Sequence, residues 1–199
     1  DIKFNGDYKK VLPIIIHGDG AIAGQGIVYE VAQMMTLDGY KTGGTVHIVV
    51  NNQVSFTTNY LDARSSIYCT DIAKVTSSPV MHVNADDVEA VVHAINFAAD
   101  FRAKFGKDVY IDLLGYRKYG HNEGDEPRFT QPNLYKLIAK HANPREIYKE
   151  KLIKENIISN SHFHRVQNYT IDIEIHILSW MNIITVITMK WRLDVNHIF

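Results

Sequence analysis

Short runs of aliphatic and β-branched residues alternate with helix-like patterns through the first 155 residues of this chain of 199. Four runs have the character of strands, and they cover residues 11–16, 45–50, 79–83 and 109–114. Apolar residues with helical spacing follow the first run over residues 27–35 and the third over residues 88–99. Because helices separate the strands, the sequence predicts an α/β fold with a doubly wound, mostly parallel sheet.

The sequence also predicts the burial of the first strand, the ends of the second helix and two further helices. The run at 11–16 is almost continuously apolar, which is typical of a strand buried on both faces. Asp86 is the expected N-cap of the second helix, with Glu89 in a capping-box relation and Gly106 at the end. Two more helices are expected near residues 133–140 and 144–154.

The composition changes near residue 156. All 12 glycines and all 5 prolines precede that position, and residues 156–199 contain no Gly, Ala or Pro. Isoleucines alternate with polar residues from Ile171 to Ile177, as in a strand. We interpret residues 1–155 as one domain and residues 156–199 as an atypical tail, aberrant or poorly packed; a β-rich second module is the alternative. The chain starts at Asp1 without a signal-like segment, so we expect a fragment.

Charge and cysteine usage exclude several classes of protein. Lys and Arg total 21 and Asp and Glu total 22, so the formal net charge is −1. Nucleic acid and membrane are therefore not expected partners, and no apolar run is long enough to span a bilayer. The single cysteine, Cys69, rules out an internal disulfide framework and is expected to be an ordinary buried thiol.

Polar segments follow three of the predicted strands. The carboxyl ends of parallel strands form the ligand crevice in sheets of this kind. The segments are His17-Gly18-Asp19-Gly20-Ala21, Asn51-Asn52-Gln53-Val54, and the loop from Tyr116 to Glu123 that contains His121. We expect these three segments to converge on one site.

A dinucleotide site fits the first segment poorly. Gly18, Gly20 and Ala23 satisfy the G-x-G-x-x-G/A pattern, and Asp38 follows at about 20 residues. However, Asp38 precedes the second strand, whereas a ribose-binding acid should end it. The charge of Asp19 would also repel a pyrophosphate unless a divalent cation lay between them.

A metal-bridged diphosphate removes both objections. Mg²⁺ prefers hard oxygen ligands, which the Asp19 carboxylate, the Asn52 amide and the Val54 carbonyl can supply. Gly18 and Gly20 would allow close backbone approach, and a helix beginning near Gly24 would direct its positive end toward the anion. The combination of Gly-Asp-Gly after one strand and Asn-Asn after the next is the pattern of thiamine diphosphate enzymes.

The other polar residues have simpler interpretations. His17 is expected to have a hydrogen-bonded structural role, and His47 and His82 to be satisfied interior or interface groups. Arg117, Lys118 and Arg128 either meet an anion or form a solvated loop face. The acids Glu123, Asp125 and Glu126 are expected to be hydrated or salt-bridged.

Residues from about 11 to 152 resemble a known family, the decarboxylating (dehydrogenase) component of the 2-oxoglutarate dehydrogenase complex. The resemblance is carried by HGDGAIAGQGIVYE, GGTVHIVVNNQVSFTT, ARSSIYCTDIAK, HVNADDVEAV and IDLLGYRKYGHNEGDEPRFTQP. It implies a thiamine diphosphate-binding fold in which Asp19, Asn52 and the Val54 carbonyl hold Mg²⁺. Gly18, Gly20 and Ala21 would line the diphosphate, and His121 matches an active-site histidine near the cofactor. Gly20 departs from the alanine that the family often has there.

The resemblance also implies an activity for the parent protein. This is oxidative decarboxylation of 2-oxoglutarate in the tricarboxylic acid cycle, with transfer of the succinyl group to the lipoyl-bearing succinyltransferase component. A homodimer in the bacterial cytoplasm or the mitochondrial matrix is implied as well. The family uses a glutamate from a separate pyrimidine-binding domain, for which the chain offers no candidate, so we expect little turnover. The alternative is a non-catalytic truncated module that only binds Mg-diphosphate or pairs with full-length subunits.

Overall fold

The computed structural model describes residues 5–159. These residues divide into two units, which we describe separately. The first unit contains the described residues up to Asn84 together with His93–Lys140, and the second contains Ala85–Val92 and the described residues from His141.

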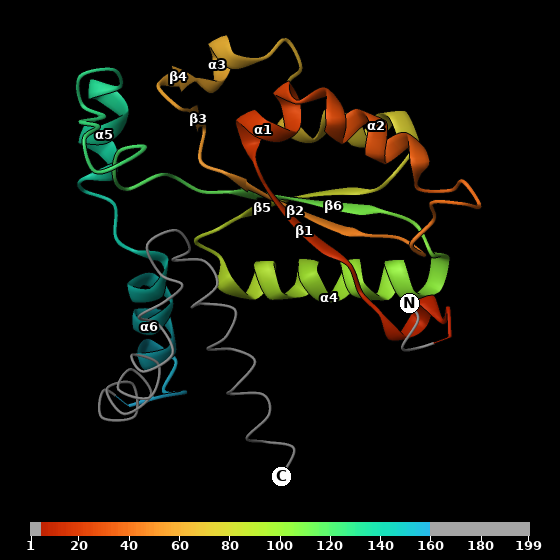
Figure 1. Ribbon diagram of the computed structural model, residues 1–199. Coiled ribbons are helices and arrows are strands. Elements are labelled where there is room, and N and C mark those ends of the chain that lie inside the picture. The colour runs from red at the N-terminus through yellow and green to blue at the C-terminus, as the bar shows by residue number, and fades with distance from the viewer. Residues whose placement is uncertain (1–4, 160–199) are drawn as a thin grey trace. The chain divides into compact units, whose positions relative to one another are not determined.

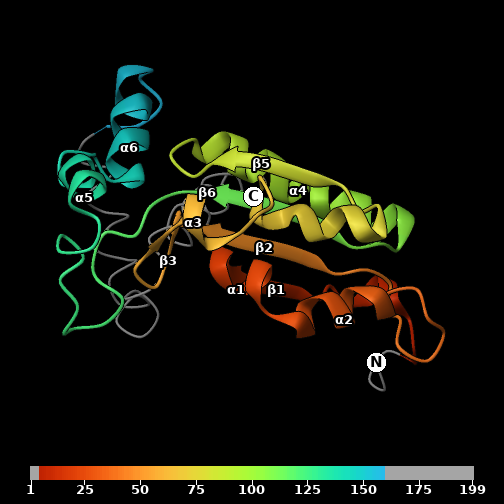
Figure 2. The same ribbon diagram turned by 90° about the horizontal axis from the view of Figure 1, so that it is seen from above.

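The first unit is built on a parallel sheet of four strands. Their order in the sheet is β1 (Ile14–Gly18), β2 (Val46–Asn51), β6 (Val109–Leu114), β5 (Val80–Asn84) (Figure 2). All three pairings are parallel, which confirms the predicted fold class. Ile14 lies opposite Val46 and Val46 opposite Val109, so β1, β2 and β6 begin level with one another.

Helices cover both faces of this sheet (Figure 1). One face carries α1 (Asp19–Gly24), α2 (Gly26–Met34) and the 3-10 helix η3 (Cys69–Thr76). The other face carries the part of α4 (Val88–Phe105) that belongs to the first unit. The two-sided cover is that of a doubly wound sheet.

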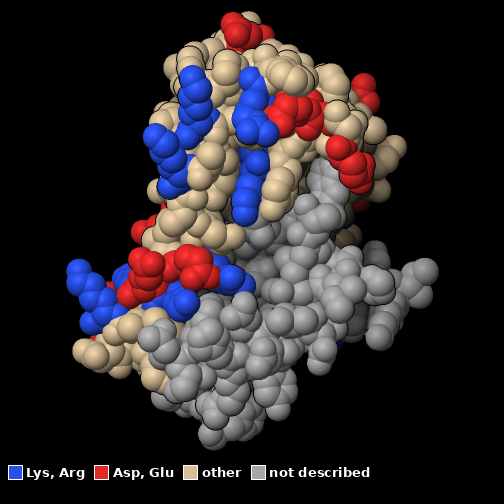
Figure 3. All heavy atoms as spheres, turned by 90° about the vertical axis from the view of Figure 1, so that its left-hand side faces the viewer, with Lys and Arg blue, Asp and Glu red and all other residues tan. Residues whose placement is uncertain are grey.

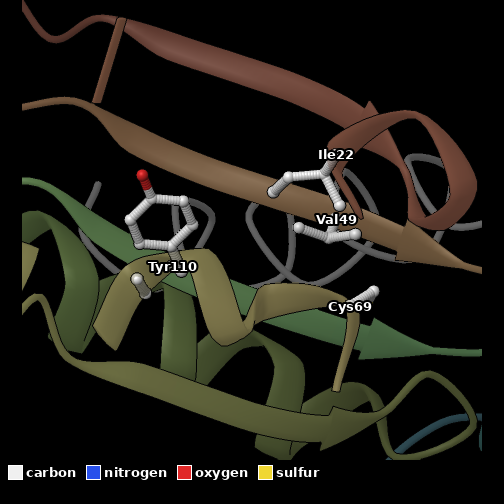
Figure 4. Packing of buried hydrophobic residues seen from close by; sticks show 5 residues of the cluster. Ile22, Val49, Cys69 and Tyr110 are labelled. Carbon is white, nitrogen blue, oxygen red and sulfur yellow. The ribbon is translucent and has the colours of Figure 1, made fainter. Parts of the chain in front are cut away.

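A cluster of buried side chains fixes α1 and η3 on the sheet (Figure 4). Ile22 of α1 and Val49 of β2 pack with Cys69 and Ala73 of η3 and with Tyr110 of β6, and each of the five is at most 2% exposed. Full burial of a large apolar side chain stabilises a fold by about 1.5–3 kcal/mol. The cluster therefore holds the start of α1 firmly above the ends of β1 and β2.

β1 is not buried on both faces, and this part of the prediction is wrong. Ile14, Ile15 and Ile16 are 54%, 40% and 50% exposed. β1 is an edge strand that pairs only with β2 in the described sheet. The apolar run predicted a strand correctly, but burial depends on neighbours, and the described residues supply them on one edge only.

The start of α4 also differs from its prediction. Asp87, rather than Asp86, lies directly before the helix and accepts a hydrogen bond from the Ala90 N–H at 3.0 Å. The helix ends at Phe105, and Gly106 takes a positive φ of 62°, as expected for a helix stop.

Arg102 ties α4 to the chain near its N-terminus. Its guanidinium donates to the carbonyls of Gly44 at 2.9 Å, Tyr8 at 2.8 Å and Thr42 at 3.1 Å. Tyr8 begins the 3-10 helix η2 (Tyr8–Lys10). One buried side chain thus joins three backbone segments that are distant in sequence.

The segment after β2 forms a small hairpin that the sequence did not predict. β3 (Val54–Ser55) pairs with β4 (Thr58–Asn59) in an antiparallel arrangement, and α3 (Tyr60–Ala63) follows. The hairpin lies beyond the carboxyl end of β2 (Figures 1 and 2). α5 (Pro132–Ile138) completes the first unit where a helix was expected.

The second unit contains α6 (Pro144–Lys154), with the predicted bounds. Tyr148 and Leu152 of α6 pack with Val88, and Lys151 Nζ lies 2.7 Å from Glu89 Oε2. The Ile171–Ile177 pattern and most of the tail lie outside the described residues, and the division at residue 155 stays a prediction.

Two properties of the described part bear on possible partners. None of its helices is long and apolar enough to cross a membrane. Figure 3 shows Lys and Arg together with Asp and Glu on the face it presents, as the balanced composition leads one to expect.

Candidate functional site

Asp19 lies at the junction of β1 and α1. It is the first residue of α1 and only 2% exposed, and its Oδ2 atom has no hydrogen-bond partner within the described residues. A buried carboxylate oxygen without a partner is costly for a fold. This oxygen of Asp19 therefore has acceptor capacity that the described residues do not use.

The surroundings of Asp19 act on its ionisation in opposite directions. Burial raises the pKa of the carboxyl, while the Arg64 guanidinium and hydrogen bonds from the backbone N–H groups of Asp19, Gly20 and Asn52 lower it. The hydrogen bond from Asn52 also shows that the ends of β1 and β2 bring Asp19 and Asn52 together.

Asn52 and Val54 form a tight turn next to this carboxylate. The Asn52 Oδ1 atom accepts the Val54 N–H at 3.0 Å, and Gln53 between them has a positive φ of 66°. An amide oxygen has two lone pairs, so Oδ1 retains acceptor capacity after this bond. Gln53 Nε2 donates to the Gly115 carbonyl at 2.9 Å, which ties this turn to the end of β6.

Gly20 is close to the hairpin. A Cβ atom at Gly20 would lie 2.7 Å from the Ser55 Cβ, which is inside van der Waals contact. The Ser55 hydroxyl is itself buried without a hydrogen-bond partner in the described part of the chain. The glycine is therefore required by its neighbour Ser55, and a second unpaired polar atom lies beside the site.

The expected phosphate loop has a different form. α2 begins at Gly26 after a break at Gln25, close to the start expected near Gly24, but the sequence did not predict the short helix α1, which begins at Asp19. Gly18 caps α1 and has nothing within 4 Å of an added Cβ, so the described packing does not require a glycine there. Ala21 is exposed on α1.

His121 lies in the loop after β6, where its backbone N–H donates to Asp125 Oδ2 at 2.8 Å. Its exposed ring contacts Phe56 edge-to-face, with 4.7 Å between ring centroids. Phe56 is in the turn of the β3–β4 hairpin, so His121 is brought to the hairpin and not into contact with Asp19.

The rest of the loop is also bound to this hairpin. Arg117 donates to the Phe56 carbonyl at 2.8 Å and to the Tyr135 hydroxyl at 3.2 Å. Arg128 pairs with Glu126 at 2.7 Å, and hydrogen bonds from Arg128 lower the pKa of Glu126 to about 2. The expectation of salt-bridged loop acids is confirmed for Glu126.

The histidines of the sheet and Cys69 of η3 have protein partners, but His82 is exposed on β5 and is not an interior group. His17 Nε2 lies 2.9 Å from His47 Nδ1, and His82 Nδ1 lies 2.8 Å from Asp112 Oδ2. Cys69 is buried, and burial raises the pKa of its thiol to about 12. This thiol is therefore not a nucleophile at neutral pH.

Arg64 is the residue of the site that the sequence did not reveal. Its Nη1 atom lies 3.9 Å from Asp19 Oδ2, and its side chain is 8% exposed. Its segment, ARSSIYCTDIAK, carries part of the family resemblance but has no role assigned from the sequence. No periodicity or spacing links Arg64 to Asp19, because the contact depends on the course of the hairpin and α3.

The donors at this site suit one kind of metal ion. Among residues 5–159, no group of three or more His, Cys, Asp or Glu side chains is placed to hold a metal. Mg²⁺ commonly takes one or two protein carboxylates together with phosphate oxygens and water, so a single carboxylate with neutral oxygens nearby is compatible with it. The fold is that of an α/β protein, and its candidate ligand site lies at the carboxyl edge of the sheet.

The chain belongs to the dehydrogenase E1 component family, whose model matches residues 3–174. It is 51% identical over 162 residues to the mitochondrial 2-oxoglutarate dehydrogenase of Dictyostelium discoideum, covering 81% of this chain and 16% of that protein. It is 57% identical over 152 residues to the 2-oxoglutarate dehydrogenase E1 component of Azotobacter vinelandii, covering 76% and 16%. It is 52% identical over 158 residues to the 2-oxoglutarate dehydrogenase E1 component of Staphylococcus aureus (strain MRSA252), covering 79% of this chain and 17% of that protein. The chain thus spans about a sixth of the length of these relatives.

Proposed function

We propose that this chain is the part of a thiamine diphosphate-dependent 2-oxoglutarate dehydrogenase E1 component that binds Mg²⁺ and the cofactor diphosphate. The observation that carries the proposal is the buried Asp19 carboxylate, which has one bare oxygen and lies against Asn52. Its relatives bear the same activity in their names, at 51–57% identity.

Asp19, the Asn52 amide and the Val54 carbonyl would hold the metal. Asp19 would supply the charge, and the turn in which Asn52 Oδ1 accepts the Val54 N–H would supply neutral oxygens. Gly18, Gly20 and Ala21 would face the diphosphate, and the Ser55 hydroxyl beside Gly20 would gain a partner. When bound, the cofactor supplies the decarboxylation chemistry, and the chain supplies position and charge.

His121 would act near the cofactor. A histidine changes charge near neutral pH and can hold or move a proton there. Its ring contacts Phe56 in the hairpin that begins at Val54, two residues after Asn52. This position supports a role at the outer side of the diphosphate site.

The whole protein would oxidatively decarboxylate 2-oxoglutarate and transfer the succinyl group to a lipoyl-bearing succinyltransferase. It would do so as a homodimer in a mitochondrial matrix or a bacterial cytoplasm. In this proposal the described residues would supply only the metal and diphosphate side of the active site. We therefore expect the chain to bind the cofactor with little or no turnover.

Isothermal titration calorimetry with thiamine diphosphate and Mg²⁺ tests the binding function. The wild-type chain should bind, and Asp19→Asn, which keeps the shape but removes the charge, should bind at least ten times more weakly. Glu30→Gln, an exposed acid on α2, is the matched control and should bind like the wild type. Equal binding by the wild type and Asp19→Asn would refute the site.

A separate assay addresses turnover. The chain should not oxidise 2-oxoglutarate with an artificial electron acceptor, whereas robust turnover would show that the site is complete without further segments. The alternative role, pairing with full-length subunits, is favoured by the exposed edge strand β1. Size-exclusion chromatography with the complete enzyme would show it as co-elution.

A further inference from the structure

Arg64 is a buried arginine whose donors are not used. Its Nε and Nη1 atoms are buried and have no hydrogen-bond partner within the described residues. A guanidinium has five N–H donors, and burying them unpaired is strongly unfavourable. Such a side chain is held inside a fold only where an opposite charge compensates it.

The compensating charge is Asp19. Arg64 Nη1 lies 3.9 Å from Asp19 Oδ2, the oxygen that also lacks a hydrogen-bond partner. Both side chains are more than nine-tenths buried, at 8% and 2% exposure. At this distance the two groups attract each other by charge but form no hydrogen bond. A new ligand can therefore pair with Asp19 or with Arg64 without breaking a hydrogen bond between them.

The local structure directs Arg64 inward. It follows α3 with an extended backbone, at φ −159° and ψ 154°, and α3 is capped by Asn59, which accepts the Leu61 N–H at 3.0 Å. The guanidinium carbon lies 5.7 Å from the centroid of the Tyr60 ring. The cap and the aromatic ring hold the arginine against the interior.

We propose that Arg64 is a positioning residue that makes metal binding at Asp19 depend on the diphosphate. This inference rests on the function proposed above. In the metal-free chain, the guanidinium is the counter-charge of Asp19. A divalent cation that binds alone is repelled by the positive charge of Arg64. A cation that binds together with a diphosphate is not, because the diphosphate carries enough negative charge to neutralise both the cation and Arg64.

The proposal has a reciprocal consequence. If the diphosphate strengthens metal binding by some factor, the metal must strengthen diphosphate binding by the same factor. Removing the Arg64 charge should therefore strengthen the binding of the metal alone and reduce this coupling factor. A purely structural arginine would affect the stability of the chain but leave the coupling unchanged.

Mn²⁺ binding, followed by electron paramagnetic resonance with and without thiamine diphosphate, measures the coupling factor directly. In the wild type we expect coupling of about 10-fold or more. In Arg64→Gln, Mn²⁺ alone should bind several times more tightly, and the coupling should fall to about 2-fold or less. Arg64→Lys keeps the charge and should retain most of the coupling. Arg128→Gln, at an arginine that is 72% exposed, is the control and should match the wild type.

The possible results separate a failure of the Arg64 role from a failure of the proposed cofactor-binding function. If the wild type binds no Mn²⁺ even with thiamine diphosphate, the proposed function fails and this inference fails with it. If the wild type binds both and Arg64→Gln has an unchanged coupling factor, only the role of Arg64 is overturned. Arg64→Met has a similar length and is used in the same way if circular dichroism shows that Arg64→Gln is unfolded.

Discussion

At the scale of single residues, Gly20 and Ser55 form a pair that excludes a larger side chain. An alanine at Gly20 would put its Cβ 2.7 Å from the Ser55 Cβ, and rotating the serine hydroxyl cannot relieve this contact. We expect Gly20→Ala to destabilise the fold by about 1–3 kcal/mol, measured as the free energy of unfolding in urea.

The double variant identifies the cause. Ser55→Gly should recover most of the loss in Gly20→Ala, because it removes the atom that the new Cβ meets. The coupling in this double-mutant cycle should be about 1 kcal/mol or more. Gly18→Ala, where nothing lies within 4 Å of the added atom, should cost much less. An undiminished loss in the double variant would contradict this explanation.

His17 makes stability depend on pH. Burial and the neighbouring His47 lower the pKa of His17 from 6.5 to about 4. Between these values the unfolded chain binds more protons at this residue than the folded chain, so stability falls as pH drops from about 7 to about 4. The contribution is on the order of 2 kcal/mol over this window.

Chemical unfolding at several pH values isolates this contribution. His17→Asn should unfold with a smaller loss of stability between pH 7 and pH 4.5 than the wild type. His93→Asn, at an exposed position on α4, should follow the wild-type dependence. Identical pH profiles for His17→Asn and the wild type would mean that His17 is not responsible.

The sequence predicts some residues of the site and misses others for a clear reason. Asp19 and Asn52 follow strands whose β-branched runs are easily recognised, and parallel strands bring their carboxyl ends to one edge. Arg64 and Ser55 reach Asp19 and Gly20 through a hairpin with two-residue strands. Such short strands carry no periodicity, so their contacts cannot be anticipated.

At the scale of elements, Arg102 holds α4 to the segments that precede β2. Its guanidinium donates to three backbone carbonyls at 2.8–3.1 Å. Arg102→Met should leave these carbonyls unpaired and lower the free energy of unfolding by about 2–4 kcal/mol. Lys104→Met, two residues on and exposed, should change it by less than about 0.5 kcal/mol.

Hydrogen exchange adds a local test of the same contact. In Arg102→Met, amides of residues 42–45 should exchange faster, because the loop loses its attachment to α4. Unchanged exchange there, with only a global loss of stability, would show that Arg102 does not organise this loop.

The elements themselves follow from the sequence more completely than their burial does. The bounds of α6 and the end of α4 agree with Pro144 and Gly106 as start and stop signals. The start of α4 was misassigned by one residue because Asp86 and Asp87 are adjacent and both can cap a helix. η3 was not predicted, because 3-10 helices rarely exceed three or four residues and this one has eight.

At the scale of the whole molecule, the exposed edge of the sheet should govern how the chain behaves in solution. Ile14 and Ile16 of β1 are 54% and 50% exposed, and Ile27 of α2 is 63% exposed. An uncovered apolar edge strand is a template for pairing with another chain. We expect concentration-dependent association in sedimentation velocity experiments.

Charged substitutions test this expectation. Ile14→Lys with Ile16→Lys should shift the chain toward the monomer, because lysine opposes edge-to-edge pairing. Phe129→Lys, at a loop residue that is 87% exposed, should leave the association unchanged. A wild type that stays monomeric at all concentrations would contradict the prediction.

The level register of β1, β2 and β6 limits how the gene can change in length. Gly18 lies opposite Val50, and Asn51 lies opposite Leu114. The number of residues from Val46 to Asn52 therefore fixes the position of Asn52 relative to Gly18. Losing one codon within β2 would move Asn52 by about 3.3 Å and turn the following side chains to the opposite face. The loop between α2 and β2 has no such constraint at residues 36–41, which precede the part that Arg102 holds. Natural insertions and deletions should therefore gather in that loop and be absent from the strand.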